Sequence, residues 1–149
     1  MRFNDDELLR GFEDCSLPEA AWDHRAHIRI AYIYLRRLPY KEALEAIRAG
    51  IKAYSAALGV RDTATTGYNE TTTCAFVQLV AFTLRHYEDL FPTHSSDQFC
   101  DTHPQLLTSR VLRLYYSPSR RTNAEAKRRF LEPDLAPLPP LPEFSAPTS

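Results

Sequence analysis

The positions of the helix-breaking residues constrain this chain more than any other feature of its sequence. Only 4 of the 149 residues are glycine, and 6 of the 11 prolines lie beyond residue 131. Between these breakers, apolar residues recur every three or four positions, as they do when one face of a helix is buried. The sequence therefore predicts an all-α, single-domain helical bundle over residues 1–131 and an extended, Pro-rich tail over residues 132–149.

The bundle is expected to contain about five to six helices. Asn4 and Asp23 are good N-cap residues for the first two. The helix over residues 69–90 is apolar on most of its faces, so it is expected at the centre of the bundle. Residues 92–103 are expected to be a loop with one short helical turn. The expected helices cover residues 4–15, 23–37, 40–58, 69–90, 104–116 and 119–130.

Composition excludes several classes of function. The chain carries 18 Lys and Arg against 19 Asp and Glu, and this near balance argues against binding to nucleic acid. The sequence has no apolar run long enough to cross a membrane, and it starts without the apolar segment of a signal peptide. Its three cysteines have neither metal-ligand spacing nor the pattern of a disulfide framework. These features predict a soluble, cytoplasmic protein.

The order of the helices brings candidate functional residues together. Short connections make successive helices antiparallel, so the N-termini of the second and fourth helices are expected at the same end of the bundle. His24 and His27 lie in the first turn of the second helix, and Glu70 begins the fourth. Two further segments should reach this end: the link that carries Trp22, and the end of the helix that carries Tyr115.

His24 and His27 are three residues apart, so they share a helix face and can hold one ion together. The positive end of the helix dipole keeps both imidazoles neutral, which is the form that a metal requires. Glu70 supplies an anionic third ligand. Two histidines and one carboxylate are typical of catalytic zinc and of non-haem iron, so a divalent metal is the expected cofactor. Without a metal, Glu70 would orient a histidine that transfers protons.

Five neighbouring residues are candidates for the chemistry and for substrate binding. Tyr68 is expected to donate a proton or a hydrogen bond. The residues expected to bind substrate are Trp22, Asn69, Thr71 and Tyr115. Structural roles are open for several of them: Trp22 as a hydrophobic staple, Thr71 as a helix cap, and Tyr68 as a packing residue over its loop.

Three other residues have a polar or nucleophilic side chain near this end. Two helix N-termini that converge on a pocket favour an anionic group there. Arg25 and Arg29 on the second helix can bind an anion, although a solvated helix face explains them better. Cys74 lies one turn into an apolar helix, so it is expected to be a buried structural thiol rather than a nucleophile.

The stretches WDHRAHIRIAYIYL and GYNETTT resemble a pattern in small helical bacterial and fungal proteins that are uncharacterised. That pattern has an aromatic residue, then H-x-x-H at a helix start, and a Y-H-E-T stretch further along. The matching residues are His24, His27, Tyr68, Glu70 and Thr71. The resemblance spans residues 20–80 and implies no known activity. Asn69 stands where the pattern often has histidine, which removes a third nitrogen ligand or places an amide beside the substrate.

These residues predict a small enzyme acting on a small organic molecule, neutral or anionic, by isomerase, cyclase, lyase or hydrolase chemistry. Two alternatives come from other classes of protein. In one, the chain is a non-catalytic helical module whose residues 138–142 dock as polyproline in an aromatic groove of a partner protein. In the other, the chain is a metal or ligand sensor without turnover. A homodimer is a further expectation, since a second copy is one way to cover the apolar fourth helix.

Overall fold

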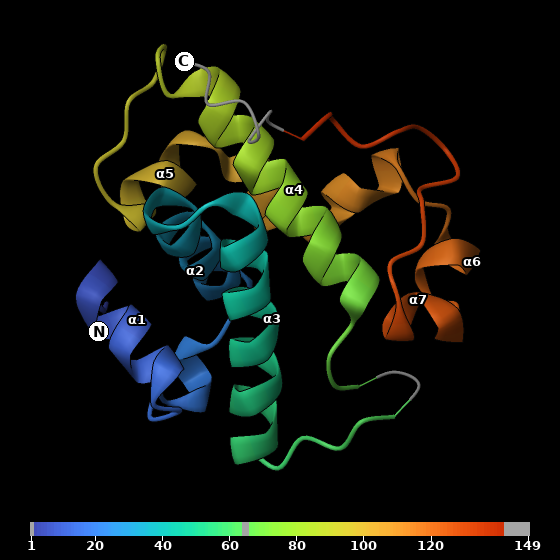
Figure 1. The fold of residues 1–149 in the computed structure, drawn as a ribbon, viewed down its shortest axis with the longest axis horizontal. Coiled ribbons are helices and arrows are strands. Elements are labelled where there is room, and N and C mark those ends of the chain that lie inside the picture. The colour runs from blue at the N-terminus through green and yellow to red at the C-terminus, as the bar shows by residue number, and fades with distance from the viewer. Residues whose placement is uncertain (1, 64–65, 142–149) are drawn as a thin grey trace.

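The structure is a computed structural model that describes residues 2–63 and 66–141. These residues form helices, turns and extended loops and contain no strand, which confirms the predicted all-α class. Figure 1 shows the helices packed around one another, with an extended C-terminal segment on one side. The elements, with 3-10 helices labelled η, are α1 (Asp5–Glu13), η1 (Glu19–Ala21), α2 (His24–Arg37), α3 (Tyr40–Ala57), α4 (Glu70–Tyr87), α5 (Ser96–Thr102), η2 (Pro104–Leu107), η3 (Ser109–Leu114), α6 (Pro118–Arg121) and α7 (Ala124–Arg128).

Three of the long helices begin with a side-chain cap. Asn4 accepts a hydrogen bond from the Glu7 N–H at 2.8 Å, and the Glu7 carboxylate accepts one from the Asn4 N–H at 3.0 Å, which completes a capping box. The side chains of Asp23 and Asn69 each accept a bond of 2.9 Å from the third residue of α2 and α4, respectively. These caps satisfy N–H groups that a helix leaves unpaired. They therefore fix the first turns, where the candidate site residues lie.

α2, rather than the predicted fourth helix, lies at the centre of the bundle. It packs against α1, α3, α4 and α5, whereas α4 packs against α2, α3 and α7. Eight of the 14 residues of α2 are buried, and the charged Arg29 is among them. The sequence prediction did not include α5 as a packing partner. Because α5 covers one face of α2, the central helix of the core is α2 rather than α4.

α5 occupies a segment that the sequence predicts as a loop with one short turn. Ser95 caps it by accepting a hydrogen bond from the Gln98 N–H at 3.1 Å. Phe99 and Cys100 are completely buried, and the Phe99 ring lies 4.9 Å from the ring of Tyr32 on α2. A helix of seven residues spans only two turns, so its apolar residues repeat too few times to reveal a helical period.

The second half of the chain differs from the prediction in a further respect. The sequence predicts one helix over residues 104–116, but the structure has the two 3-10 helices η2 and η3 there. Thr108 accepts a hydrogen bond from a backbone N–H two residues later and so starts a new element inside this segment. Asn123 does the same and divides the predicted basic helix over residues 119–130 into α6 and α7. In both predicted helices, a short polar side chain that bonds to the local backbone therefore divides the helix into two shorter elements.

The Pro-rich tail packs on the bundle as far as residue 141. Leu138 is buried, and the Pro139 carbonyl accepts a hydrogen bond of 2.8 Å from the Gln78 side chain on α4. The Leu135 N–H donates to the Tyr115 carbonyl at 2.9 Å. Figure 1 shows this extended segment in red, running from α7 toward α4. Of the two conformations expected for the tail, the described part is the one wrapped over the domain; residues 142–149 lie outside the described residues.

α4 buries its apolar residues within this chain. The helices α2, α3 and α7 and the tail all contact it. The homodimer stays a prediction, because a second copy is not required to cover α4. In the described part of the chain, no helix combines the length and the apolar character needed to cross a membrane.

Candidate functional site

The first turns of α2 and α4 meet at a small cavity of about 70 Å³. His24 and His27 line it from α2, and Thr72 and Thr73 line it from α4. The rest of its wall is apolar and consists of Ile28, Ala31, Ile47, Ile51, Phe76 and Val77. This histidine cavity confirms the prediction that the N-termini of the second and fourth helices lie at the same end of the bundle.

Each imidazole in this cavity is held by a backbone carbonyl. The Nε2 atom of His24 lies 2.9 Å from the carbonyl oxygen of Leu106, and the Nδ1 atom of His27 lies 2.8 Å from that of Asp23. A carbonyl oxygen only accepts, so each of these nitrogens carries the proton. In a neutral ring the lone pair then belongs to His24 Nδ1 and His27 Nε2. Among the described residues, neither of these two atoms has a hydrogen-bond partner.

Aromatic rings enclose both histidines. The Trp22 ring lies 4.0 Å from the His27 ring, and Phe12 stacks on the other side of the cluster, 4.9 Å from Trp22. The edge of Phe76 meets His24 at 4.7 Å. Burial lowers the pKa of His27 below its ordinary value, and the neighbouring His24 lowers it further. The ring of His27 is therefore neutral at pH 7. Trp22, which the sequence predicts to bind substrate, contacts His27 but does not line the histidine cavity.

Glu70 lies in a different set of contacts, the glutamate network of Arg48, Tyr68, Glu70 and Cys74. Arg48 binds both carboxylate oxygens, from Nε at 2.9 Å and from Nη2 at 2.7 Å. Tyr68 donates its hydroxyl at 2.6 Å, and the Cys74 thiol donates at 3.2 Å. Burial raises the pKa of Glu70, but the bonds from these three groups outweigh burial and lower the pKa to about 2.

The glutamate network has no free group for catalysis. Burial and the bond to Glu70 raise the pKa of Tyr68 well above its ordinary value, so its hydroxyl stays protonated at neutral pH and its hydrogen bond goes to Glu70. Burial also raises the pKa of Cys74, to about 12, which fits the predicted structural thiol. Glu70 is ionised and already accepts bonds on both oxygens. The prediction that Tyr68 and Glu70 act directly on a substrate therefore has no support in this geometry.

The predicted metal ligands are not gathered around one point. His24 and His27 share a cavity, with ring centroids 6.5 Å apart, but Glu70 faces Arg48 instead. Within residues 2–63 and 66–141, no three His, Cys, Asp or Glu side chains are arranged to hold a metal ion. The sequence prediction did not consider Arg48, whose guanidinium competes for the same carboxylate. Zinc or iron as a cofactor stays a prediction.

The histidine cavity and the glutamate network adjoin at one residue. Thr73 lines the cavity, and its hydroxyl also hydrogen-bonds Tyr68. Ile51 lines the cavity one position before Lys52, whose ammonium lies 5.0 Å from the centre of the Tyr68 ring. The two motifs of the sequence thus lie side by side without forming one constellation.

Three residues predicted to bind substrate have structural roles instead. Asn69 caps α4 with its side-chain oxygen. The Thr71 hydroxyl donates to the Arg129 carbonyl at 2.8 Å and accepts from the Leu131 N–H at 3.0 Å, so it holds the C-terminal segment. Tyr115 accepts a bond from the tail through its carbonyl. None of the three lines the histidine cavity.

Sequence reasoning missed two parts of the site. The Leu106 carbonyl holds His24 because it lies in a 3-10 segment, and the predicted helix over this region would have used that carbonyl internally. No sequence signal identifies a backbone acceptor of this kind. Arg48 did leave a signal, since it directly follows Ile47 and so lies at the edge of the helix face that Ile47 and Ile51 share.

Comparisons with known proteins give no assignment for this arrangement. The resemblance of the H-x-x-H and Y-N-E-T stretches to uncharacterised helical proteins stays an expectation. No family model, no curated protein and no solved structure matches the chain.

Proposed function

We propose that this chain is a small enzyme that uses His24 and His27 for proton transfer on a small organic molecule. One observation carries the proposal: both rings line the same cavity, each donates one N–H to a backbone carbonyl, and the second nitrogen of each has no hydrogen-bond partner among the described residues. A neutral imidazole with a free lone pair is a general base. Carbonyl acceptors also stabilise the imidazolium that forms when the ring takes up a proton.

The reaction class follows from two histidines that line one cavity. One ring removes a proton from carbon or oxygen of the substrate, and that ring or its neighbour returns a proton to a different atom. The net result is an isomerisation or cyclisation, or a dehydration when a hydroxyl leaves as water. Correctly placed acid–base groups accelerate such steps by about 10²–10⁴-fold. The lowered pKa of His27 keeps this base unprotonated at neutral pH.

The cavity wall indicates the kind of substrate. Six apolar residues and two threonine hydroxyls surround the histidines in a space of about 70 Å³. This space is smaller than a typical small-molecule site of about 300 Å³ or more, so it would hold only one end of a substrate, a few carbon atoms with one carbonyl or hydroxyl that the threonines can orient. The N-terminus of α2 carries a partial positive charge, which favours an oxygen that becomes negative during the reaction.

A metal-dependent form of this function is the second candidate. Histidines that bind metals commonly donate their other N–H to a carbonyl or carboxylate, as His24 and His27 do here. In this form the ion would take two protein nitrogens, and water or substrate would supply its other ligands. Elemental analysis of untagged protein purified without chelator, beside the double variant His24→Ala and His27→Ala, separates the two forms. Zinc or iron lost in the double variant assigns a metal, and its absence after reconstitution leaves proton transfer alone.

The proton-transfer proposal has a direct structural test. Nitrogen NMR of the imidazoles at neutral pH should show the proton on Nε2 of His24 and on Nδ1 of His27. The opposite tautomers would leave no lone pair where the proposal requires one. This measurement needs no knowledge of the substrate.

The functional test is a screen of small carbonyl and hydroxy compounds for exchange of carbon-bound hydrogen with heavy water. Exchange should fall by about 10²-fold or more in His24→Gln and in His27→Gln. It should be unchanged in His94→Gln, because His94 is exposed and remote from the cavity lining. Equal exchange in all variants, or no exchange with any compound of the screen, would overturn the proposal.

A further inference from the structure

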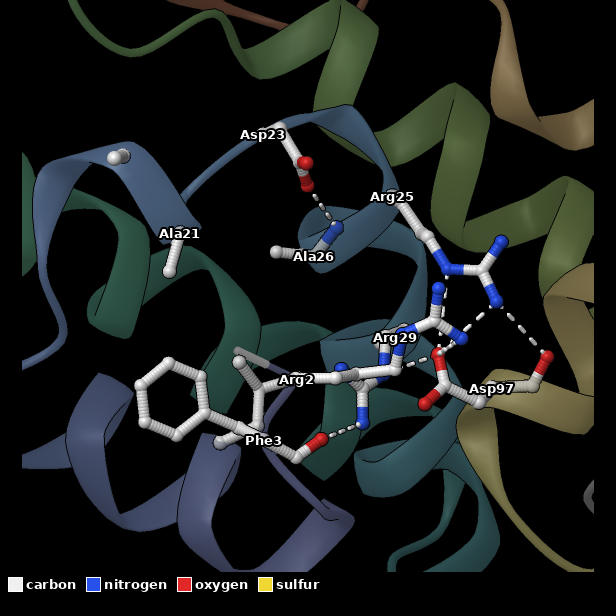
Figure 2. Close-up of a pocket in the computed structure, with 10 residues that line it drawn as sticks. Arg2, Phe3, Ala21, Asp23, Arg25, Ala26, Arg29 and Asp97 are labelled. Carbon is white, nitrogen blue, oxygen red and sulfur yellow. Dashed lines mark hydrogen bonds and ion pairs between the residues drawn. The ribbon is translucent and has the colours of Figure 1, made fainter.

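The polar groups of the histidine cavity have already used most of their hydrogens. His24 donates its Nε2 hydrogen to the Leu106 carbonyl at 2.9 Å, and His27 donates its Nδ1 hydrogen to the Asp23 carbonyl at 2.8 Å. Figure 2 shows that Asp23 is itself held, because its side chain accepts a bond from the Ala26 N–H. A neutral imidazole has a single N–H, so both histidines offer a ligand an acceptor and no donor.

The free nitrogens of both rings remain accessible. In the described part of the chain, the side-chain nitrogen and oxygen atoms that are fully buried and also lack a partner are His103 Nε2 and Arg121 Nε. The Nδ1 atom of His24 and the Nε2 atom of His27 lack a partner too, but they are not among these buried atoms. Each therefore has exposed surface through which a ligand can approach.

The Thr73 hydroxyl has no hydrogen to spare either. Tyr68 donates its own hydroxyl hydrogen to Glu70 at 2.6 Å. The hydrogen in the bond between Thr73 and Tyr68 must therefore come from Thr73, which leaves the Thr73 oxygen as an acceptor. Thr72 is the remaining polar residue of the lining, and its hydroxyl has no partner within residues 2–63 and 66–141, so it can donate or accept.

The arginines near this end of the bundle do not supply the missing donors. Arg25 and Arg29 lie beside the histidines on α2, but Figure 2 shows that both are directed at Asp97 on α5, at 3.0 and 3.5 Å. Arg48 is paired with Glu70. Of the described side chains that line the histidine cavity, none is a lysine or an arginine. A carboxylate or phosphate therefore has no cation to pair with there.

We propose that the histidine cavity selects a substrate that enters it with a hydroxyl group rather than a carbonyl group. A hydroxyl can donate to a free imidazole nitrogen and at the same time accept from Thr72. A carbonyl can only accept from Thr72, so it leaves both imidazole nitrogens unpaired. The inference rests on the proposed function, because it concerns the same cavity, and it names the substrate class as an alcohol with a short carbon chain around its hydroxyl.

Tyr68 is the positioning residue for this preference, although it does not line the cavity. It holds the hydrogen of Thr73 and so keeps Thr73 from donating to a carbonyl. Glu70 fixes the direction of that bond, because it takes the hydrogen of Tyr68. The glutamate network thereby decides which hydrogen-bonding groups the adjoining cavity accepts.

The probes are 2-propanol and acetone, which share one skeleton of heavy atoms and differ in whether the oxygen can donate. They are titrated into the full chain at about pH 8, where an imidazole of ordinary pKa is neutral. Binding of 2-propanol should shift the nitrogen NMR signal of at least one free imidazole nitrogen, on His24 or on His27. Acetone should bind about tenfold more weakly or less, since it leaves these acceptors unpaired.

Tyr68→Phe tests the role of Tyr68. It removes the acceptor of the Thr73 hydrogen, so Thr73 becomes a donor and the ratio of the two affinities should fall by about threefold or more. The ratio is the readout because a general loosening of the cavity would weaken both probes alike. Tyr87→Phe is the matched control, since Tyr87 is also on α4 but is exposed and outside the lining.

Three outcomes would overturn the inference: no shift with either probe, acetone binding as tightly as 2-propanol, or an unchanged ratio in Tyr68→Phe. These binding results are distinct from those of the hydrogen-exchange screen. Selective binding of 2-propanol without exchange of any compound would remove the proton-transfer proposal and keep the hydroxyl preference. Exchange in carbonyl compounds alone, with no selective binding of 2-propanol, would do the reverse.

Discussion

The histidine cavity and the glutamate network lie side by side, yet they differ in how much hydrogen-bonding capacity they retain. In the histidine cavity, each ring uses one nitrogen on a backbone carbonyl and keeps the other free. In the glutamate network, both oxygens of Glu70 accept bonds from Arg48, Tyr68 and Cys74. Residue types that suit catalysis occur in both. The comparison teaches that reactivity depends on which atoms the fold leaves unpaired.

This difference has a simple structural origin. His24 and His27 are held by backbone atoms, which engage one nitrogen and do not neutralise the ring. Glu70 meets the side chain of Arg48, a full opposite charge with several donors. The first arrangement orients a functional group, whereas the second joins α3 to α4. The predictions below test this contrast through stability, cavity shape, the C-terminal contact and pH.

The largest effect is expected from Glu70→Ala. It leaves Arg48, Tyr68 and Cys74 without their acceptor in a partly buried setting, where the side chains of Arg48 and Glu70 are 23% and 15% exposed. Loss of one partner of a buried pair costs about 3–5 kcal/mol, and partial exposure reduces this to about 2–3 kcal/mol. Urea denaturation measures the loss.

The control for this prediction is Glu45→Gln. Glu45 pairs with the same Arg48, but its side chain is 70% exposed, so its removal should cost less than about 0.5 kcal/mol. Equal losses for Glu70→Ala and Glu45→Gln would show that the glutamate network is no more stabilising than a surface ion pair.

The next largest effect is expected from Gly50→Ala on α3. A Cβ atom at Gly50 would lie well inside contact distance of Phe12 Cε2, and the Phe12 ring is buried. Overpacking of this kind costs about 1–3 kcal/mol. Because Phe12 stacks on Trp22 and the Trp22 ring contacts the His27 ring, the shift should reach the histidine cavity.

Fluorescence provides the readout, since Trp22 is the single tryptophan of the chain. Gly50→Ala should change the emission of Trp22 as well as the denaturation midpoint. Ala49→Ser, at an exposed position on the same helix, should change neither by more than the about 0.5 kcal/mol typical of surface substitutions. Unchanged emission in Gly50→Ala would mean that the aromatic stack does not transmit the displacement.

A smaller effect is expected from Thr71→Val. In the first turn of α4, Thr71 holds the C-terminal segment, whereas Thr72 and Thr73 line the histidine cavity. The substitution keeps the shape but removes the bonds to the Arg129 carbonyl and from the Leu131 N–H, at about 1–2 kcal/mol. Limited proteolysis should then cleave the C-terminal segment faster. The histidine cavity should be unaffected, because Thr72 and Thr73 line it and Thr71 does not. Altered imidazole tautomers in Thr71→Val would contradict this separation.

As the pH falls, the histidine cavity should lose its contribution to stability first and the glutamate network second. The pKa of His27 is lowered from an ordinary 6.5 by burial, so its contribution to stability is present above pH 6.5 and is lost as the pH falls below it. The pKa of Glu70 falls from 4.5 to about 2, so its contribution is lost only between those two values. The unfolding free energy of His27→Gln should therefore fall less than that of wild type just below pH 6.5.

Glu70→Gln supplies the complementary curve. It should reduce the pH dependence between about 4.5 and 2, where Glu88 and other carboxylates with lowered pKa values also titrate, and leave the decline below pH 6.5 in place. The buried His103, whose pKa is also lowered mainly by burial, accounts for the decline that remains in His27→Gln. A single transition that both variants share would show that the two regions do not titrate separately.

The sequence predicts the local features of this fold well. Asn4 and Asp23 indicate helix starts because a cap acts on N–H groups only two or three residues away, and Asn69, predicted to bind substrate, caps α4 in the same way. The common end of α2 and α4 is also predictable, since it depends only on the number of helices between them. Where the prediction fails, as at Thr108 and Asn123, the same side-chain chemistry starts a new helix inside an expected one.

The composition of the site depends on partners that are distant in the sequence. The acceptor of His24 is 82 residues away, and the main partner of Glu70 is 22 residues away. No local pattern specifies which of many possible contacts a side chain will make after packing. Sequence reasoning therefore identified His24, His27 and Trp22 as neighbours. It placed Glu70 with the two histidines, whereas in the structure Glu70 bonds to Arg48.

The tail contacts have a consequence for the order of synthesis. Leu131 and Leu138 are buried, and Leu131 bonds to Thr71 and Tyr116 through its backbone. A ribosome makes these leucines after every helix of the bundle, and they are still inside its exit tunnel when α2, α3 and α4 have emerged. The start of α4 is therefore fastened only after these leucines have left the tunnel, and until then the Thr71 hydroxyl lacks its C-terminal partners.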